Sequence, residues 1–247
     1  MAALPSERPP LEPGARRDLP PTTVHLLRLD SVSAARQHGG HKRTIVEDVS
    51  LTVRSGEVVG VYGARGSGKT TLLHMAAGML EPDSGAATFD GRDVAEQQRA
   101  IAWVGQADPA ITDLPTDAQV ALPLFGTLGY RRAQRAAMGM LAKVGATEYA
   151  SCSWLELPTA IRPSVAIAHA LISDPAVLIV DDAACGLSAI EREHFVGLLR
   201  LLAEDDNLAV LFAASDTTAL SSAHRLYFLS RGRLVAPDAT RHHNRGA

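Results

Sequence analysis

The segment GARGSGKT, Gly63 to Thr70, constrains this sequence of 247 residues more than any other feature. It fits the pattern G-x-x-x-x-G-K-[ST] and lies between EVVGVY, which is typical of a strand, and GKTTLLHMAAGML, which has helical spacing. Glycines let backbone N–H groups surround phosphate oxygens, and the amino end of the following helix adds its dipole. A plain strand-to-helix turn does not explain Lys and Thr at this offset, so the sequence predicts a nucleotide-binding loop.

The loop predicts roles for its individual residues. Lys69 is expected to contact the β- and γ-phosphates, and the Thr70 hydroxyl is expected to bind Mg²⁺. A second apolar run, AVLIVDD, ends on Asp181, which is expected to help hold the metal ion. Without the phosphate loop, Asp181 would be interpreted as a helix-capping residue. The presence of the loop favours the interpretation that Asp181 helps to hold Mg²⁺. The predicted nucleotide-binding residues are Gly63, Ala64, Arg65, Gly66, Ser67, Gly68, Lys69, Thr70 and Thr71.

Composition excludes several classes of protein. A hydrophobic share of 46% and a charged share of 21% are typical of a globular chain. The net charge of −3 gives no indication of a nucleic-acid partner. Cys152 and Cys185 lack the spacing of a zinc site or a disulfide framework, which fits a reducing compartment. No apolar run approaches the roughly 18 residues of a membrane helix, so a cytoplasmic location is expected.

The order of the predicted elements indicates the fold class. Strands alternate with helices after an antiparallel start, which predicts an α/β fold with a mostly parallel sheet and helices on both faces. The segment RLYFLSRGRLV predicts a last hairpin. Residues 1–22 are rich in Pro, and they and residues 237–247 are predicted to be disordered tails around a domain at 23–236.

Further segments surround the loop in a characteristic order. GEVVGVYGARGSGKTTLLHMAAGMLEPDSGAATFDGRDV is followed by VGQ and then by VAIAHALISDPAVLIVDD. Together they resemble the ATP-binding subunits of ABC transporters, most of all the branch that serves lipoprotein-release and macrolide-efflux permeases. The resemblance covers about residues 24–235. It implies a P-loop NTPase that has a RecA-like, mostly parallel sheet, an antiparallel β-subdomain and a helical subdomain at about 108–172.

The resemblance also implies ligands and partners. ATP and Mg²⁺ would be bound by a dimer, either a homodimer or a heterodimer with another ABC ATPase subunit. A separate membrane permease subunit would hold that dimer on the inner face of the plasma membrane. Gln106 corresponds to the glutamine that contacts Mg²⁺ and the attacking water, although a surface glutamine ending a strand is the plain alternative. The segment from Ala107 to about Gly126 would line the groove that receives a permease helix.

Three positions depart from the family pattern where water is activated. The catalytic glutamate corresponds to Asp182, whose carboxylate falls short by about one bond length, roughly 1.5 Å. Loss of a well-placed general base typically costs about 10²–10⁴ in rate. The switch histidine corresponds to Ser215, which cannot span to the γ-phosphate as an imidazole does, and the D-loop aspartate corresponds to Ser188.

The signature motif LSGGQ, which grips the nucleotide of the partner subunit, corresponds to LPTAI, Leu157 to Ile161. Without its glycines, Cβ atoms hinder a close approach of backbone to phosphate. Pro163 is expected to disfavour helical geometry at Arg162, so that the helix begins about a turn late. The aromatic residue that stacks on adenine corresponds to a position near Arg36.

Three hypotheses stay open. In the first, the subunit binds MgATP and hydrolyses it slowly or not at all. In the second, it is a fully active motor in which Asp182 suffices and other side chains replace the missing ones. The predicted catalytic residues are Lys69, Gln106 and Asp182. In the third, ATP is only a ligand of a regulatory module. A small-molecule kinase has no support, because it does not explain VAIAHAL and DPAVLIVDD in that register.

Overall fold

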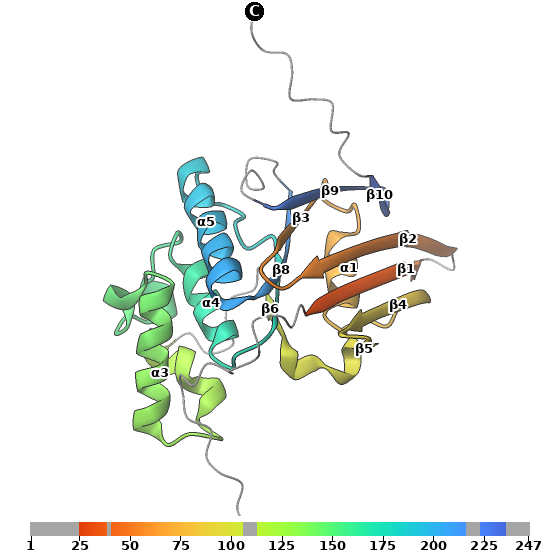
Figure 1. Cartoon of the computed structure of the whole chain (residues 1–247). Helices are drawn as coiled ribbons and strands as arrows, with labels where there is room; N and C mark the ends of the chain where they lie inside the picture. Colours follow the sequence, from red (N-terminus) through yellow and green to blue (C-terminus); the bar gives the residue numbers. More distant parts are fainter. Residues whose placement is uncertain (1–24, 39–40, 106–112, 216–222, 236–247) are drawn as a thin grey trace, which may run out of the picture.

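The computed structural model describes residues 25–38, 41–105, 113–215 and 223–235 (Figure 1). Gln106 and the first part of the predicted permease groove, up to residue 112, lie outside the described residues. The two predicted tails, 1–22 and 237–247, lie outside them as well.

A six-stranded sheet forms the centre of the molecule, in the order β10-β9-β3-β8-β7-β6. Strands β9, β3, β8, β7 and β6 are parallel, and β10 pairs antiparallel with β9, as the predicted hairpin requires. Every residue of β7 and β8 is buried, because both faces of these strands are covered. The strands are β3 Val58–Tyr62, β6 Ile101–Val104, β7 Val177–Asp181, β8 Ala209–Ala214, β9 Arg225–Ser230 and β10 Arg233–Val235.

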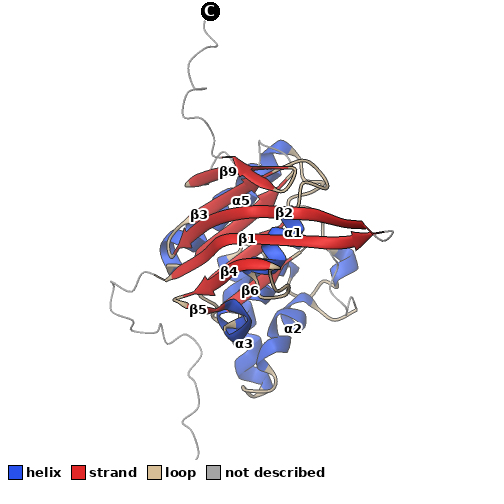
Figure 2. Ribbon diagram, turned by 90° about the vertical axis from the view of Figure 1, so that its right-hand side faces the viewer, coloured by secondary structure: helices blue, strands red, loops and turns tan. Residues whose placement is uncertain are grey.

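A second, antiparallel sheet has the order β2-β1-β4-β5. Its two long strands, β1 and β2, run side by side across the face shown in Figure 2. The helix α1, Lys69–Ala76, packs between this sheet and the central one, and apolar side chains from all three form one core. The strands are β1 Leu26–His38, β2 His41–Arg54, β4 Ser84–Phe89 and β5 Arg92–Asp93.

A second core lies on the other face of the central sheet, and four helices contribute side chains to it. Along β7 the residues alternate between the two cores: Leu178 and Val180 join the helices, whereas Val177 and Ile179 face α1. The remaining helices are α2 Thr116–Ala121, α3 Tyr130–Lys143, α4 Arg162–Leu171 and α5 Ala189–Asp206. Short 3₁₀ turns are η1 Val94–Glu96, η2 Gln98–Ala100, η3 Leu122–Leu124, η4 Thr147–Tyr149 and η5 Trp154–Glu156.

The predicted fold class is confirmed: a mostly parallel sheet, an antiparallel sheet and helices around a loop that joins β3 to α1. Within the described ranges, no helix combines the length and the apolarity that crossing a membrane requires.

Phe212 in the middle of β8 gives the first prediction. Its side chain is fully buried, and its ring packs edge-on against that of Phe195 on α5, with 6.1 Å between centroids. Phe212→Ala is expected to lower the free energy of unfolding by about 3–5 kcal/mol, through lost burial and the cavity left behind. Urea unfolding followed by circular dichroism measures this.

The matched control is Leu201→Ala on the exposed face of α5, which should change stability by less than about 0.5 kcal/mol. Equal losses in the two variants would contradict the assignment of Phe212 to the core.

Candidate nucleotide-binding site

The loop between β3 and α1 runs close to backbone from distant strands. Gly68 has a φ of 107°, and a Cβ there would stand 2.6 Å from the carbonyl oxygen of Ile45 on β2. A Cβ on Gly63 would stand 2.6 Å from the carbonyl oxygen of Leu229 on β9. Two of the three glycines in the motif are therefore required by close packing, in addition to the conformational freedom that Gly68 uses.

Lys69 is the most enclosed charge of the loop, with 7% of the residue exposed. Its ammonium group donates to the carbonyl oxygens of Gly63 at 2.6 Å and Ala64 at 3.3 Å. It also donates to the Ser215 hydroxyl at 3.0 Å. These three acceptors account for the three N–H bonds of the ammonium, so Lys69 is fixed at the base of the loop.

Thr70 and Asp181 meet beside Lys69. The Thr70 hydroxyl donates to Oδ2 of Asp181 at 2.7 Å, although the two residues are 111 positions apart. Asp181 is 7% exposed, and its Oδ1 is buried without a hydrogen-bond partner among the described residues. A buried carboxylate oxygen without a donor is unfavourable unless a cation balances it. The hydroxyl and carboxylate oxygens therefore fit Mg²⁺, which prefers oxygen ligands.

Asp182 and Ser215, two of the predicted departures, are hydrogen-bonded to each other. The backbone N–H of Ser215 donates to Oδ1 of Asp182 at 3.1 Å, and the Ser215 hydroxyl donates to Oδ2 at 2.8 Å. Asp182 itself has a φ of 52°, in the left-handed region. Ser215 thus holds both oxygens of the Asp182 carboxylate, a contact that the sequence did not predict because the two residues lie 33 positions apart.

Ser188, the third departure, has a structural role that the sequence analysis missed. Its hydroxyl accepts from the backbone N–H of Glu191 at 3.3 Å, and the Glu191 carboxylate accepts from the Ser188 N–H at 2.7 Å. This capping box begins α5. The hydrogen bonds from Ser188, first of all from its backbone amide, lower the pKa of the Glu191 carboxyl. The S-x-x-E spacing in SAIE was the signal in the sequence.

The segment LPTAI forms a turn that continues into α4. The N–H of Ile161 donates to the carbonyl oxygen of Pro158 at 2.9 Å, and Arg162 is the first helical residue. The prediction that Pro163 keeps Arg162 out of the helix is wrong. Proline is accepted here because N–H groups in the first turn have no acceptor within the helix.

Arg162 then folds back over this segment. Its guanidinium donates to the carbonyl oxygens of Leu157 at 3.3 Å and Leu155 at 3.4 Å, and it lies 5.8 Å from the ring centre of Trp154. An arginine side chain thus covers the backbone of LPTAI at its first residue.

A cavity of about 1110 Å³ lies beside the loop, whose residues form part of its wall. It is large enough for a nucleotide by the standard of small-molecule sites. Arg43 lines it, whereas Arg36 is its cross-strand neighbour on the β1–β2 hairpin and is exposed. Arg36, the position that corresponds to adenine stacking, does not line this cavity, although its cross-strand neighbour does. The stacking role itself stays a prediction. The lining comprises Arg43, Thr44, Ile45, Tyr62, residues 63–71 and residues 228–232.

Comparison with known proteins agrees with this geometry. The family model described as "ABC transporter" matches residues 46–185, more than half of the chain. The chain belongs to the ABC transporter family. The lipoprotein-releasing system ATP-binding protein LolD of Chromohalobacter salexigens is 30% identical over 85% of this chain and 92% of its own length. The chain is thus an ABC transporter ATP-binding subunit with LolD-type relatives.

Solved structures show the same fold. The dimeric ATP-binding cassette MJ0796, described as a post-hydrolysis state bound to ADP and Pi, superposes with a TM-score of 0.76 at 23% identity. The match covers 84% of this chain and 96% of that one. The protein cbiO1 of Clostridium perfringens also gives a TM-score of 0.76, at 20% identity, over 85% of this chain and 86% of its own.

The ligand of an ABC transporter ATP-binding subunit is MgATP, so the predicted contact between Asp181 and Mg²⁺ can be tested. Asp181→Asn is isosteric but removes the charge that faces the metal ion. In the natural chain Mg²⁺ is expected to raise ATP affinity about 10–100-fold, the typical worth of a charged contact. In the variant this gain should fall below about threefold. Calorimetric titration with ATP, in Mg²⁺ and in EDTA, measures it.

Asp174→Asn, at an exposed turn, is the control and should keep the full dependence on Mg²⁺. An unchanged Mg²⁺ effect in Asp181→Asn would remove Asp181 from the metal site.

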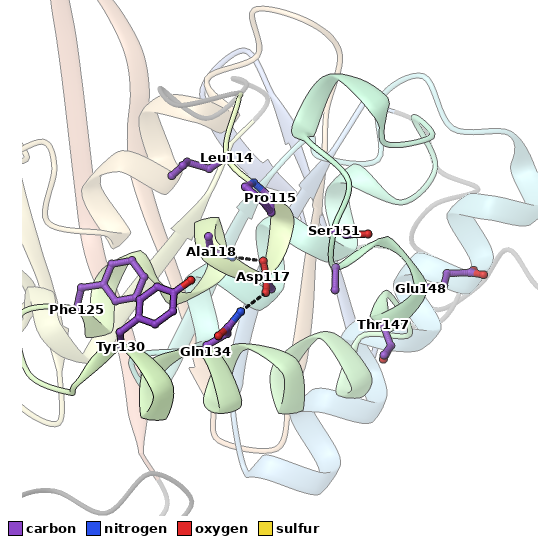
Figure 3. Close-up of a pocket in the computed structure, with 11 residues that line it drawn as sticks. Leu114, Pro115, Asp117, Ala118, Phe125, Tyr130, Gln134, Thr147, Glu148 and Ser151 are labelled. Carbon is purple, nitrogen blue, oxygen red and sulfur yellow. Dashed lines mark hydrogen bonds between the residues drawn. The ribbon is translucent and has the colours of Figure 1, made fainter.

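This ABC transporter subunit has a second concavity, of about 550 Å³ (Figure 3). It is formed by α2, α3, η4 and the loops next to them. The rings of Phe125 and Tyr130 stack at its edge, 5.6 Å apart, and are 37% and 60% exposed. Asp117 in its wall accepts from the N–H of Ala118 at 2.7 Å and from the Gln134 amide at 2.8 Å. The lining is Leu114, Pro115, Asp117, Ala118, Phe125, Tyr130, Gln134, Thr147, Glu148, Ala150 and Ser151.

Proposed function

We propose that this ATP-binding subunit binds MgATP through Lys69, Thr70 and Asp181, and hydrolyses it slowly or not at all. The observation that carries the proposal is the clamped Asp182 carboxylate beside an intact phosphate loop. The loop keeps its glycines and its enclosed lysine for the phosphates. Asp181, at the end of β7, offers a buried oxygen without a hydrogen-bond partner to a metal ion. The residues needed to bind MgATP are therefore present.

The position of the Asp182 carboxylate favours slow hydrolysis. A general base must come within about 2.6–3.2 Å of the water that it activates. Asp182 has the shorter side chain, and both of its oxygens already accept hydrogen bonds from Ser215. Ser215 in turn has no imidazole to reach a γ-phosphate. The Asp182 carboxylate, in the position of the general base, is therefore held away from the attacking water. Ser215 does not replace the missing contact to the γ-phosphate.

The segment LPTAI supports the same conclusion for the partner's nucleotide. Its Thr159 and Ala160 carry Cβ atoms where the family pattern has glycines, and the Arg162 side chain occupies the carbonyl of Leu157. A homodimer would carry this defect and the Asp182 defect in both sites. A heterodimer with an intact subunit would divide them, one to each site.

We also propose that a separate membrane permease couples to this subunit through the concavity in Figure 3. Leu114, Phe125 and other residues of the predicted segment 107–126 line it. The stacked Phe125 and Tyr130 rings offer an apolar shelf for one helix of a permease. Attachment of this kind would place the subunit at the inner face of the plasma membrane.

The test measures MgATP binding and phosphate release by the purified chain, with Lys69→Ala as the background control. Binding is expected with release below about 0.1 s⁻¹, roughly a hundredfold slower than a typical enzyme turnover of about 10 s⁻¹. A rate near 10 s⁻¹ would instead support the fully active motor. Folded protein that does not bind MgATP would refute the proposal altogether.

A further inference from the structure

We infer that Ser215 is a positioning residue that ties the Lys69 ammonium to the Asp182 carboxylate, forming a latch that phosphate must open. The latch rests on the proposed function, because it acts on the same nucleotide site. It assigns a role to Ser215 beyond the absence of an imidazole.

The hydrogen bonds of the latch have a fixed direction. Lys69 can only donate, and it donates to the Ser215 oxygen at 3.0 Å. The single hydroxyl proton of Ser215 is then directed to Oδ2 of Asp182, 2.8 Å away. A cation, a hydroxyl and an anion thus form a continuous chain, and hydrogen bonds to charged groups are the stronger kind. All three groups are partly buried, which reduces competition from water.

The carboxylate end of the chain is anchored. The backbone N–H of Ser215 holds Oδ1 of Asp182, and the backbone N–H of Asp182 donates to the carbonyl oxygen of Ala213 at 3.0 Å. The carboxylate is therefore fixed relative to the end of β8, and the hydroxyl of Ser215 stays between it and Lys69.

A phosphate oxygen that binds Lys69 must replace one of the three acceptors. Two of them, the carbonyls of Gly63 and Ala64, belong to the loop, and Gly63 is confined by its close approach to Leu229. The Ser215 hydroxyl comes from another strand and rotates about a single bond. It is the acceptor that gives way, so the latch weakens nucleotide binding by the strength of that contact.

The direction of this effect separates a latch from a merely structural residue. Ser215→Ala is expected to bind MgATP about 3–10-fold more tightly than the natural chain, since one hydrogen bond is typically worth that factor. Ser215→Thr keeps the hydroxyl and should bind with the natural affinity. Ser215→Cys is nearly isosteric but a poor acceptor, so it should fall between them. Competition against a fluorescent ATP analogue measures all four proteins, and thermal unfolding checks that each is folded.

The outcomes are distinct. Unchanged or weaker binding by folded Ser215→Ala overturns the latch, and so does tighter binding by Ser215→Thr. If Ser215→Ala does not fold, the comparison of Ser215→Cys with Ser215→Thr decides, and equal affinities overturn the latch. No binding by the natural chain but binding by Ser215→Ala would support a latch that dominates the site. No binding by any of the folded proteins would refute the latch and the proposed function together.

Discussion

Asp182→Glu combined with Ser215→His is expected to raise phosphate release about a hundredfold or more over the natural chain. The added methylene advances the carboxylate by about 1.5 Å, toward water at the γ-phosphate. The histidine removes the hydroxyl that now holds Oδ2 of Asp182 and that accepts from Lys69. Each change alone should recover only part of the gain, because the two side chains touch and their effects are coupled.

Steady-state phosphate release at saturating MgATP measures the gain, at protein concentrations high enough for dimers. Adding Lys69→Ala to the double variant is the control and should return the rate to background. If the double variant binds MgATP normally without a faster rate, the missing base is not what limits turnover. The four replacements that turn LPTAI into LSGGQ, Pro158→Ser, Thr159→Gly, Ala160→Gly and Ile161→Gln, would then be the next to test.

Lys69→Ala is expected to lower the affinity for MgATP by about a hundredfold. The ammonium is held in place by the Gly63 and Ala64 carbonyls, so its charge stays within the loop that is expected to bind the phosphates. Hydrogen bonds to charged groups are worth about 1.5–3 kcal/mol each, which corresponds to roughly 10–100-fold in a binding constant. Calorimetric titration measures the loss.

The control removes the same charge elsewhere: Arg92→Ala, at an exposed position of β5, should leave the affinity within about twofold. Lys69→Arg should also lose affinity for MgATP, because a planar guanidinium does not fit three acceptors arranged around one ammonium nitrogen. Retained affinity in Lys69→Ala would show that this lysine does not hold the phosphates.

Much of the fold followed from local pattern. The strand, loop and helix around Gly63–Thr70 were predicted because glycine spacing and apolar periodicity act over a few residues. The buried run ending at Asp181 was predicted for the same reason, and it lies beside Thr70 in the structure. Arg162 was predicted to be non-helical and is instead the first residue of α4, because the preference against a helical residue before proline is weaker than the geometry of a first turn.

The sequence by itself determined the phosphate loop, the α/β order and the family of this protein, because each depends on residues close together in the chain. The tertiary structure alone decided which distant residues meet. Ser215 lies 33 residues from Asp182 and 146 from Lys69, and only the parallel order β3-β8-β7 brings their strand ends together. Likewise the β1–β2 register sets Arg43 rather than Arg36 at the cavity. Strand order and register arise from packing of the whole chain, so no local pattern encodes them.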